Sequence, residues 1–303
     1  MKYLNHQDRP YPRVCAHRGM HWNTAPENSI PAFAMAAALG ADEIELDLWP
    51  DKEGRMFVFH DPSIEHITGE KRLISDLTTK EVLALDIGSA YSPAFKGLRI
   101  PTFEEVLDLV GKKCILNIHI KSPVENTVRT PTLENRVNRW YRYYYGNEAI
   151  MPPFRDLPTE IDKVFENRPF TRYSEKNFGA ILDLLDKYDC REYAYIAGER
   201  DVLQVAREMA PDMERCCLEA MNFTLVQHAL EFGCTKVQFN KEATNPALYK
   251  AAKDNGLSCN LFWCNIGEEA CAYIDYGIDT ILTDNFQVVN NAVQKHLKKQ
   301  TQD

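Results

Sequence analysis

The feature that most constrains the fold is the alternation of short apolar runs with helical patterns along the 303 residues. Apolar runs such as RVCAH (13–17) are typical of strands. SIPAFAMAAALG (29–40) predicts a helix that Ser29 caps and Gly40 ends. Eight strand–helix units with right-handed crossovers form a (β/α)₈ barrel. The predicted strands are 13–17, 43–49, 114–120, 192–196, 214–218, 236–239, 258–263 and 280–283.

Two long stretches do not fit a plain barrel. Residues 61–101 are predicted to be an insertion after the short strand 56–60. Residues 124–190, rich in aromatic side chains, are too long for an ordinary loop. We expect 124–190 to form a helical lid or subdomain at the barrel mouth, and a surface elaboration or dimer contact is the alternative. With these insertions, 1–303 is predicted to be a single barrel domain.

An open, doubly wound sheet is the alternative fold. No glycine-rich nucleotide loop follows the first predicted strand, which argues against it. Net charge is -9 and the pI is about 5.5, so a basic nucleic-acid-binding face is not expected.

The sequence also predicts where the protein works. No apolar run approaches the roughly 20 residues of a membrane span, and no signal peptide is visible. The nine scattered cysteines include no C-x-x-C pair and are typical of a reducing cytoplasm. We expect a cytoplasmic protein with a small-molecule partner, and a homo-oligomer remains open.

Polar side chains gather at the predicted strand ends, where a barrel enzyme carries its active site. In CILNIHIK (114–121), side chains alternate between faces, so Asn117, His119 and Lys121 point the same way. Three acids share one face of the strand 43–49, namely Glu43, Glu45 and Asp47. Carboxylates inside a parallel barrel need a cation, either a metal or Lys121 itself.

Three further strand ends carry notable side chains, His17, His60 and Trp263. A lone histidine at such a position is usually a satisfied polar residue, and tryptophan more often packs in a core. Their joint occurrence at one predicted barrel mouth favours a functional site.

Taken together, the motifs resemble the glycerophosphodiester phosphodiesterase family. The family pattern stands here as His17-Arg18-Gly19, Pro26-Glu27-Asn28-Ser29, Gly40-Ala41-Asp42, Glu45-x-Asp47 and His60-Asp61. The segments 97–110 and 276–286 also look like the family. The resemblance covers residues 12–122 tightly and 190–290 loosely, and it too implies a (β/α)₈ barrel.

The resemblance implies one divalent metal ion, bound by Glu45, Asp47 and the residue at position 119. The family has a carboxylate at that third position, whereas this chain has His119. Mg²⁺ or Ca²⁺ is implied by the family, but an imidazole ligand makes Mn²⁺, Co²⁺ or Zn²⁺ acceptable. The change to His119 leaves four alternatives open: a different metal, weaker metal binding, another role for His119, or a degraded site.

The resemblance also implies roles for the other residues. His17 and His60 form the acid/base pair, with His17 as base and His60 as acid, or the reverse. Glu27 orients His17 or a hydroxyl at the metal. Binding of the substrate and its phosphate is implied for Arg18, Lys121, Glu27 and Trp263, of which Trp263 forms an apolar wall for the alcohol.

The implied function is hydrolysis of glycerophosphodiesters, or related small phosphodiesters, to an alcohol and glycerol phosphate. A lyase-type relative that keeps a cyclic phosphate is one alternative. A repurposed or non-catalytic phosphate- or sugar-binding barrel is another. Analysis of the products by phosphorus NMR would separate the first two, and ligand binding without turnover in any divalent metal would indicate the third.

Overall fold

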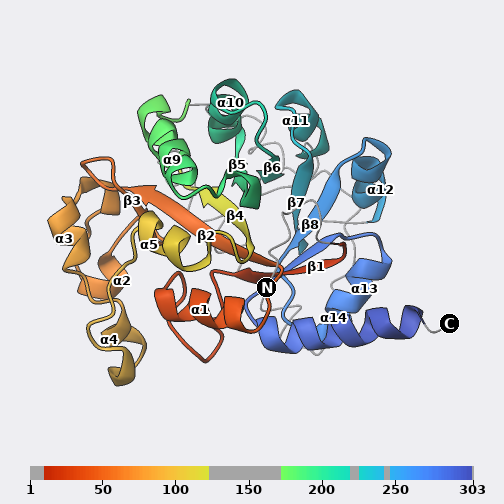
Figure 1. Ribbon diagram of the computed structural model, residues 1–303, viewed down its shortest axis with the longest axis horizontal. Helices are drawn as coiled ribbons and strands as arrows, with labels where there is room; N and C mark the ends of the chain where they lie inside the picture. Colours follow the sequence, from red (N-terminus) through yellow and green to blue (C-terminus); the bar gives the residue numbers. More distant parts are fainter. Residues whose placement is uncertain (1–9, 123–171, 219–224, 242–245, 302–303) are drawn as a thin grey trace.

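A closed barrel of parallel strands forms the centre of the molecule in a computed structural model, which describes residues 10–122, 172–218, 225–241 and 246–301. Its strands are β1 (Arg13–His17), β2 (Glu43–Pro50), β4 (Ile115–Ile120), β5 (Ala194–Gly198), β6 (Arg215–Leu218), β7 (Lys236–Asn240), β8 (Ser258–Phe262) and β9 (Thr280–Thr283). Each pairs in parallel with the next, and β9 pairs back with β1 (Figure 1). The predicted (β/α)₈ barrel is therefore confirmed, and the open sheet is wrong.

Helices surround the barrel (Figure 1). They are α1 (Ile30–Ala38), α5 (Phe103–Val110), α9 (Glu175–Lys187), α10 (Arg200–Met209), α11 (Leu225–Glu231), α12 (Pro246–Asp254), α13 (Gly267–Asp275) and α14 (Phe286–Gln300). The predicted cap of α1 is present, because Ser29 accepts a hydrogen bond from the Ala32 amide. At the start of α5, Thr102 forms a capping box with Glu105. No helix in the described ranges is both long and apolar enough to cross a membrane.

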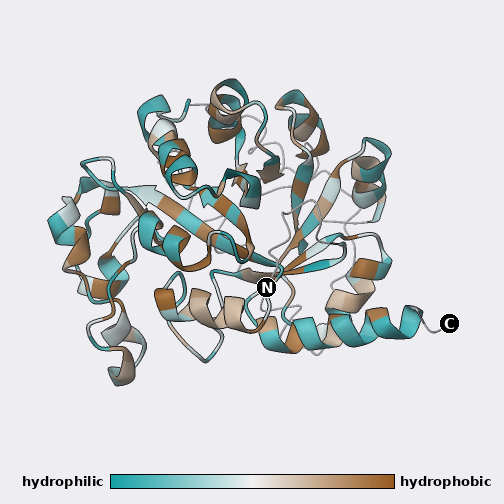
Figure 2. Cartoon of the chain, viewed as in Figure 1, coloured by the Kyte–Doolittle hydropathy of each residue, from teal (hydrophilic) through white to brown (hydrophobic). Residues whose placement is uncertain are grey.

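The two faces of the barrel strands bury different kinds of side chain, apolar on one face and polar on the other. All eight residues of β2 are buried, and Ile44, Leu46 and Leu48 belong to the main hydrophobic core. Glu43, Glu45 and Asp47 alternate with these apolar residues along β2. The three acids therefore face the barrel interior. Figure 2 shows the resulting alternation of hydrophobic and hydrophilic residues along β2. Deep in the barrel, Glu43 accepts hydrogen bonds from Arg13 (3.1 Å) and from Tyr195 (2.9 Å).

The predicted insertion 61–101 is a folded extension on one side of the barrel (Figure 1). It follows β3 (Met56–Val58), which pairs antiparallel with β2. Its elements are α2 (Glu65–Thr68), η2 (Ile74–Asp76), α3 (Thr79–Leu83), α4 (Gly88–Tyr91) and η3 (Pro93–Phe95). A second hydrophobic core joins it to β2 and β3, formed by Trp49, Phe57, Phe59, Ile64, Ile74, Leu77, Val82 and Ile100. We call this the satellite core.

Most of the other predicted insertion, 124–190, lies outside the described residues. Its described part begins at Arg172 and contains α9. The short η4 (Arg191–Tyr193) then leads into β5. The lid or subdomain that we expect at the barrel mouth stays a prediction.

Arg215, the first residue of β6, fixes two helix ends on the barrel. Its buried guanidinium donates to the carbonyl oxygens of Ala210, Pro211, Met213, Phe232 and Gly233, at 2.8–3.2 Å. These carbonyls follow α10 and α11, where the helix dipole is negative. Arg215 therefore acts as a buried cation between two helix C-termini.

Candidate active site

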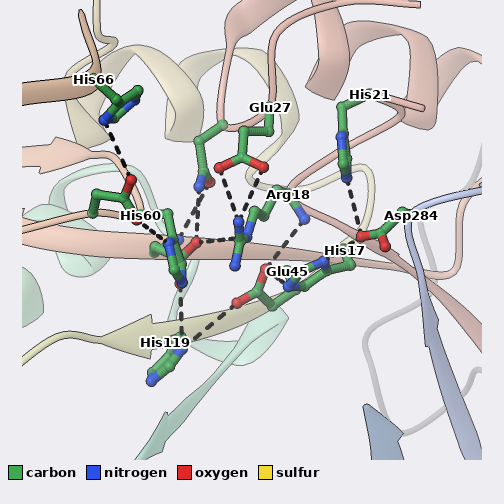
Figure 3. Close-up of polar contacts among 12 residues, drawn as sticks. His17, Arg18, His21, Glu27, Glu45, His60, His66, His119 and Asp284 are labelled. Atoms are coloured by element: carbon green, nitrogen blue, oxygen red, sulfur yellow. Dashed lines mark hydrogen bonds and ion pairs between the residues drawn. The ribbon is translucent and has the colours of Figure 1, made fainter. Parts of the chain in front are cut away.

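Three adjacent strands bring most of the predicted site residues together at the barrel mouth. His17 is the last residue of β1 and lies in register with Glu45 of β2. Asp47 of β2 lies in register with His119 of β4. Figure 3 shows His17, Glu45 and His119 pointing toward a common centre, with Arg18 above it.

The candidate metal centre consists of Glu45, Asp47 and His119, whose ligand atoms all lie within 4.8 Å of one another. His119 Nδ1 is 3.2 Å from Asp47 Oδ1 and 3.8 Å from Glu45 Oε1. Lys121 Nζ is 3.0 Å from both Asp47 Oδ1 and His119 Nδ1. Two buried carboxylates and one imidazole fit a divalent cation, and Mn²⁺, Co²⁺ and Zn²⁺ tolerate the nitrogen ligand best.

The pKa values of the two carboxylates of this centre are shifted in opposite directions. Burial, followed by the neighbouring charge of Asp47, raises the pKa of Glu45. Burial also disfavours the charge of Asp47, but Lys121, His60 and Arg18 outweigh it and hold the pKa of Asp47 well below its usual range. Two buried acids this close ionise together only beside positive charge, which Lys121 and Arg18 supply here and to which a divalent metal would add.

Arg18 lies between the metal centre and the solvent. Its backbone amide donates to Glu45 Oε2 (3.1 Å), and its Nε is 3.3 Å from Asp47 Oδ2. Its Nη1 donates to both carboxylate oxygens of Glu27, at 2.9 and 3.0 Å. A phosphate that binds Arg18 would meet a guanidinium already aligned by two carboxylates.

A tight backbone turn places Arg18 in this position. Arg18 and Gly19 both have positive φ, at 54° and 84°. A Cβ atom on Gly19 would lie 2.8 Å from the carbonyl carbon of Ala32, so only glycine fits against α1. Asn28 then donates to Asp47 Oδ2 (2.8 Å), which ties the same turn to β2. The H-R-G and P-E-N-S motifs therefore meet to orient Arg18.

The side chain of His17 is held by Asp284, which follows β9. His17 Nδ1 lies 2.6 Å from Asp284 Oδ1, and His21 Nε2 lies 3.1 Å from the same oxygen (Figure 3). Burial opposes the charge of Asp284, but hydrogen bonds from His17 and His21 hold its pKa well below the usual range. An ionised carboxylate only accepts hydrogen bonds, so His17 carries its ring proton on Nδ1. The lone pair of Nε2, 3.7 Å from Glu45 Oε2, then faces the metal centre.

His60 has a similar carboxylate partner on the other side of Arg18. Its Nδ1 lies 2.7 Å from Asp61 Oδ1, and His66 Nδ1 lies 3.3 Å from Asp61 Oδ2. Burial and the positive charge of Lys121 lower the pKa of His60 to about 4. At neutral pH, His60 is therefore an uncharged imidazole with a lone pair on Nε2.

Not every predicted residue has the predicted contacts. From the sequence, Glu27 is expected beside His17 or a hydroxyl at the metal. In the structure, Glu27 accepts a hydrogen bond from Arg18, and His17 is hydrogen-bonded to Asp284. Trp263 is half-buried after β8, with its ring 4.9 Å from that of Phe262. Asn117 lies deeper in the barrel and donates to Gln238 on β7 (3.3 Å).

Sequence reasoning missed three polar residues at the site, His21, His66 and Asn265, and it placed Asp284 at the barrel mouth without assigning it a role. Asn265 donates to Asp284 Oδ2 (2.8 Å) and accepts from the Asp284 amide (2.8 Å). The available signal was the position of Asp284 directly after an apolar strand, where a barrel presents functional side chains. His21 and His66 lie in loops, whose paths no periodicity predicts.

Comparison with known proteins identifies relatives of this barrel. The model of the Glycerophosphoryl diester phosphodiesterase family matches residues 17–149. A glycerophosphodiester phosphodiesterase of Caldanaerobacter subterraneus subsp. tengcongensis is 29% identical, over 93% of this chain and 98% of that protein. One from Bacillus altitudinis is 33% identical over 46% of this chain and 56% of its own length.

Solved structures show the same fold. An Oleispira antarctica phosphodiesterase in complex with the product sn-glycerol-3-phosphate has a TM-score of 0.71 and 19% identity, with 94% of this chain and 97% of that chain covered. A glycerophosphodiester phosphodiesterase from Agrobacterium tumefaciens has a TM-score of 0.65 and 16% identity, covering 91% and 98%.

The chain thus has the (β/α)₈ barrel fold of these phosphodiesterases. The resemblance to the glycerophosphodiester phosphodiesterase family that the sequence motifs indicated is confirmed.

Proposed function

We propose that this enzyme hydrolyses glycerophosphodiesters to an alcohol and glycerol phosphate with the help of one divalent metal ion. The observation that carries the proposal is the mouth cluster, in which Glu45, Asp47 and His119 converge beside Arg18 and Lys121. The family match and the relatives' names support glycerophosphodiester phosphodiesterase activity. The Oleispira protein, whose structure was solved with the product sn-glycerol-3-phosphate, supports the same product for this barrel.

The metal would be held by Glu45, Asp47 and His119, and when bound it would neutralise charge on the phosphoryl oxygens. The chain itself supplies two more positive charges. Arg18 and Lys121 are both aligned by Asp47, at 3.3 and 3.0 Å, and would bind the phosphate oxygens. Glu27 keeps the guanidinium of Arg18 in place. The half-buried ring of Trp263 would contact the alcohol.

The two histidines would move the protons. A general base must be deprotonated at rest, and the low pKa of His60 makes it so at neutral pH. We therefore assign His60 as the base that takes the proton from the attacking hydroxyl or water. His17 would take up a proton from solvent on Nε2 and pass it to the leaving alkoxide, while Asp284 holds its Nδ1 proton. This order is the reverse of the first assignment made from the sequence.

Phosphorus NMR of the reaction with glycerophosphodiesters and Mg²⁺, Mn²⁺, Co²⁺ or Zn²⁺ tests the proposal. We expect glycerol phosphate as the final product. His17→Ala and His60→Ala should each lose about 10²–10⁴-fold in activity, the usual cost of removing an acid/base group. His296→Ala is the matched control, since that residue contacts Asp275 on the outer helices.

Metal binding is tested separately by calorimetry. Glu45→Gln and Asp47→Asn should each weaken the affinity for the activating metal. Near-normal turnover in either histidine variant, or unchanged metal affinity in both carboxylate variants, would contradict the proposal. A cyclic phosphate that persists as the final product would indicate a lyase instead.

A further inference from the structure

A second group of metal-ligating side chains lies on the β1–β9 side of the mouth. The ligand atoms of His17, His21 and Asp284 all lie within 4.8 Å of one another. His17 Nδ1 and His21 Nε2 converge on the same carboxylate oxygen, at 2.6 and 3.1 Å. None of these three residues belongs to the centre formed by Glu45, Asp47 and His119.

The site around His60 shows that this convergence is not a general feature of histidines that share an aspartate. His60 and His66 contact different oxygens of Asp61, at 2.7 and 3.3 Å. In the described residues, these two histidines and Asp61 do not form a group that could hold a metal. The difference provides a matched control within the same protein.

The chemistry of the three ligands indicates which metal would bind. Two imidazoles and one carboxylate are a ligand set typical of Zn²⁺ sites that keep one open position. Tetrahedral ligands about 2.0–2.1 Å from zinc lie about 3.3 Å apart. The two nitrogen–oxygen distances of 2.6 and 3.1 Å would therefore need to lengthen only slightly to admit the ion. Asn265 donates a hydrogen bond to the other carboxylate oxygen of Asp284, Oδ2, at 2.8 Å. Carboxylate ligands of metal sites are commonly oriented by such hydrogen bonds.

We propose that His17, His21 and Asp284 form a second metal site, selective for Zn²⁺ and similar transition metals, and that its occupation inhibits the enzyme. Hard Mg²⁺ and Ca²⁺ prefer shells of oxygen atoms, so they should not compete for a site with two nitrogen ligands. The same metal could therefore activate at one centre and inhibit at the other.

Inhibition follows from the atoms of the imidazole ring, and this step rests on the proposed function. In the free protein, the ring proton of His17 is on Nδ1 and the lone pair is on Nε2. Zinc at Nδ1 requires that lone pair there, so the single ring proton moves to Nε2. A turnover needs Nε2 both to gain and to lose a proton, and a neutral, zinc-bound ring holds its remaining proton too tightly for that.

Zinc stoichiometry tests the site without any activity measurement. Titration against a chromophoric chelator should show two Zn²⁺ per wild-type chain and one per His21→Gln chain. The Gln amide nitrogen can replace His21 Nε2 as donor to Asp284, so the variant loses a ligand but keeps the hydrogen bond. The control His66→Asn should still bind two. One Zn²⁺ in the wild-type chain, or the same number in wild type and His21→Gln, would overturn the site.

A second measurement needs no variant. Co²⁺ added beyond one equivalent to the wild-type protein should shift the ring NMR signals of both His17 and His21. Unshifted His21 signals would also overturn the site.

Activity then tests the inhibition. With Mg²⁺ present, we expect excess Zn²⁺ to inhibit the wild type and His66→Asn at least tenfold more strongly than His21→Gln. Equal inhibition of all three would overturn the inhibitory role even where two zinc ions bind. Absence of phosphodiesterase activity with Mg²⁺ alone would count against the proposed function and leave the zinc stoichiometry as a separate result.

Discussion

Replacing Lys121 with methionine should raise the pKa of His60. Burial is the largest cause of the low pKa of about 4, and the charge of Lys121 is the next. The displacement from the ordinary value near 6.5 corresponds to about 3 kcal/mol against the imidazolium. One positive charge acting through a partly buried region contributes about 1–2 kcal/mol of this, or about one pKa unit. Methionine keeps most of the length of the side chain and removes the charged ammonium, so burial should keep the pKa of His60 below 6.5.

NMR of protein with ¹³C-labelled histidine rings measures this directly. Between pH 8 and 5.5, the His60 signal of the wild type should stay nearly constant, whereas that of Lys121→Met should begin to shift. Lys250→Met is the control, because Lys250 pairs with Asp254 on the outer surface of α12. A wild-type midpoint near 6.5 would refute the assignment of His60 as the resting base, and an unchanged midpoint in Lys121→Met would refute the role of Lys121.

Two further changes probe the metal centre and the barrel. His119→Glu adds a negative oxygen ligand, so the affinity should shift toward Mg²⁺ and Ca²⁺ relative to Zn²⁺; if calorimetry ranks the metals identically for both proteins, His119 is not a ligand. Arg215→Met leaves five carbonyl oxygens without their buried cation, which should lower the free energy of unfolding by about 3–5 kcal/mol. Urea denaturation measures that loss, and a change as small as that of Lys250→Met would contradict the account of Arg215.

The barrel and the convergence of Glu45, Asp47 and His119 could be predicted from sequence because both depend on the strand period, whereas the metal-binding role of these residues was implied by the family resemblance. Alternation along β2 and β4 fixes which residues face inward, and parallel register then brings Asp47 beside His119. Contacts between loops have no such period. The pairing of His17 with Asp284 joins residues 267 positions apart, and it depends on how the chain closes the barrel between β9 and β1. The contact of Glu27 with Arg18 was not predicted for a related reason, since both residues lie outside the regular strands and helices.

The satellite core is much smaller than the main hydrophobic core of the barrel, so the two should open with different free energies. His60 and Asp61 stand at the start of the segment that this small core holds in place, and the indole of Trp49 donates to the His60 carbonyl (3.0 Å). Few apolar side chains need to separate for residues 61–101 to detach, compared with the many that close the barrel. Local opening of that segment therefore costs less free energy than global unfolding. Mild heat or denaturant would remove His60 from the site while the barrel, with Glu45, Asp47 and His119 on β2 and β4, stays folded.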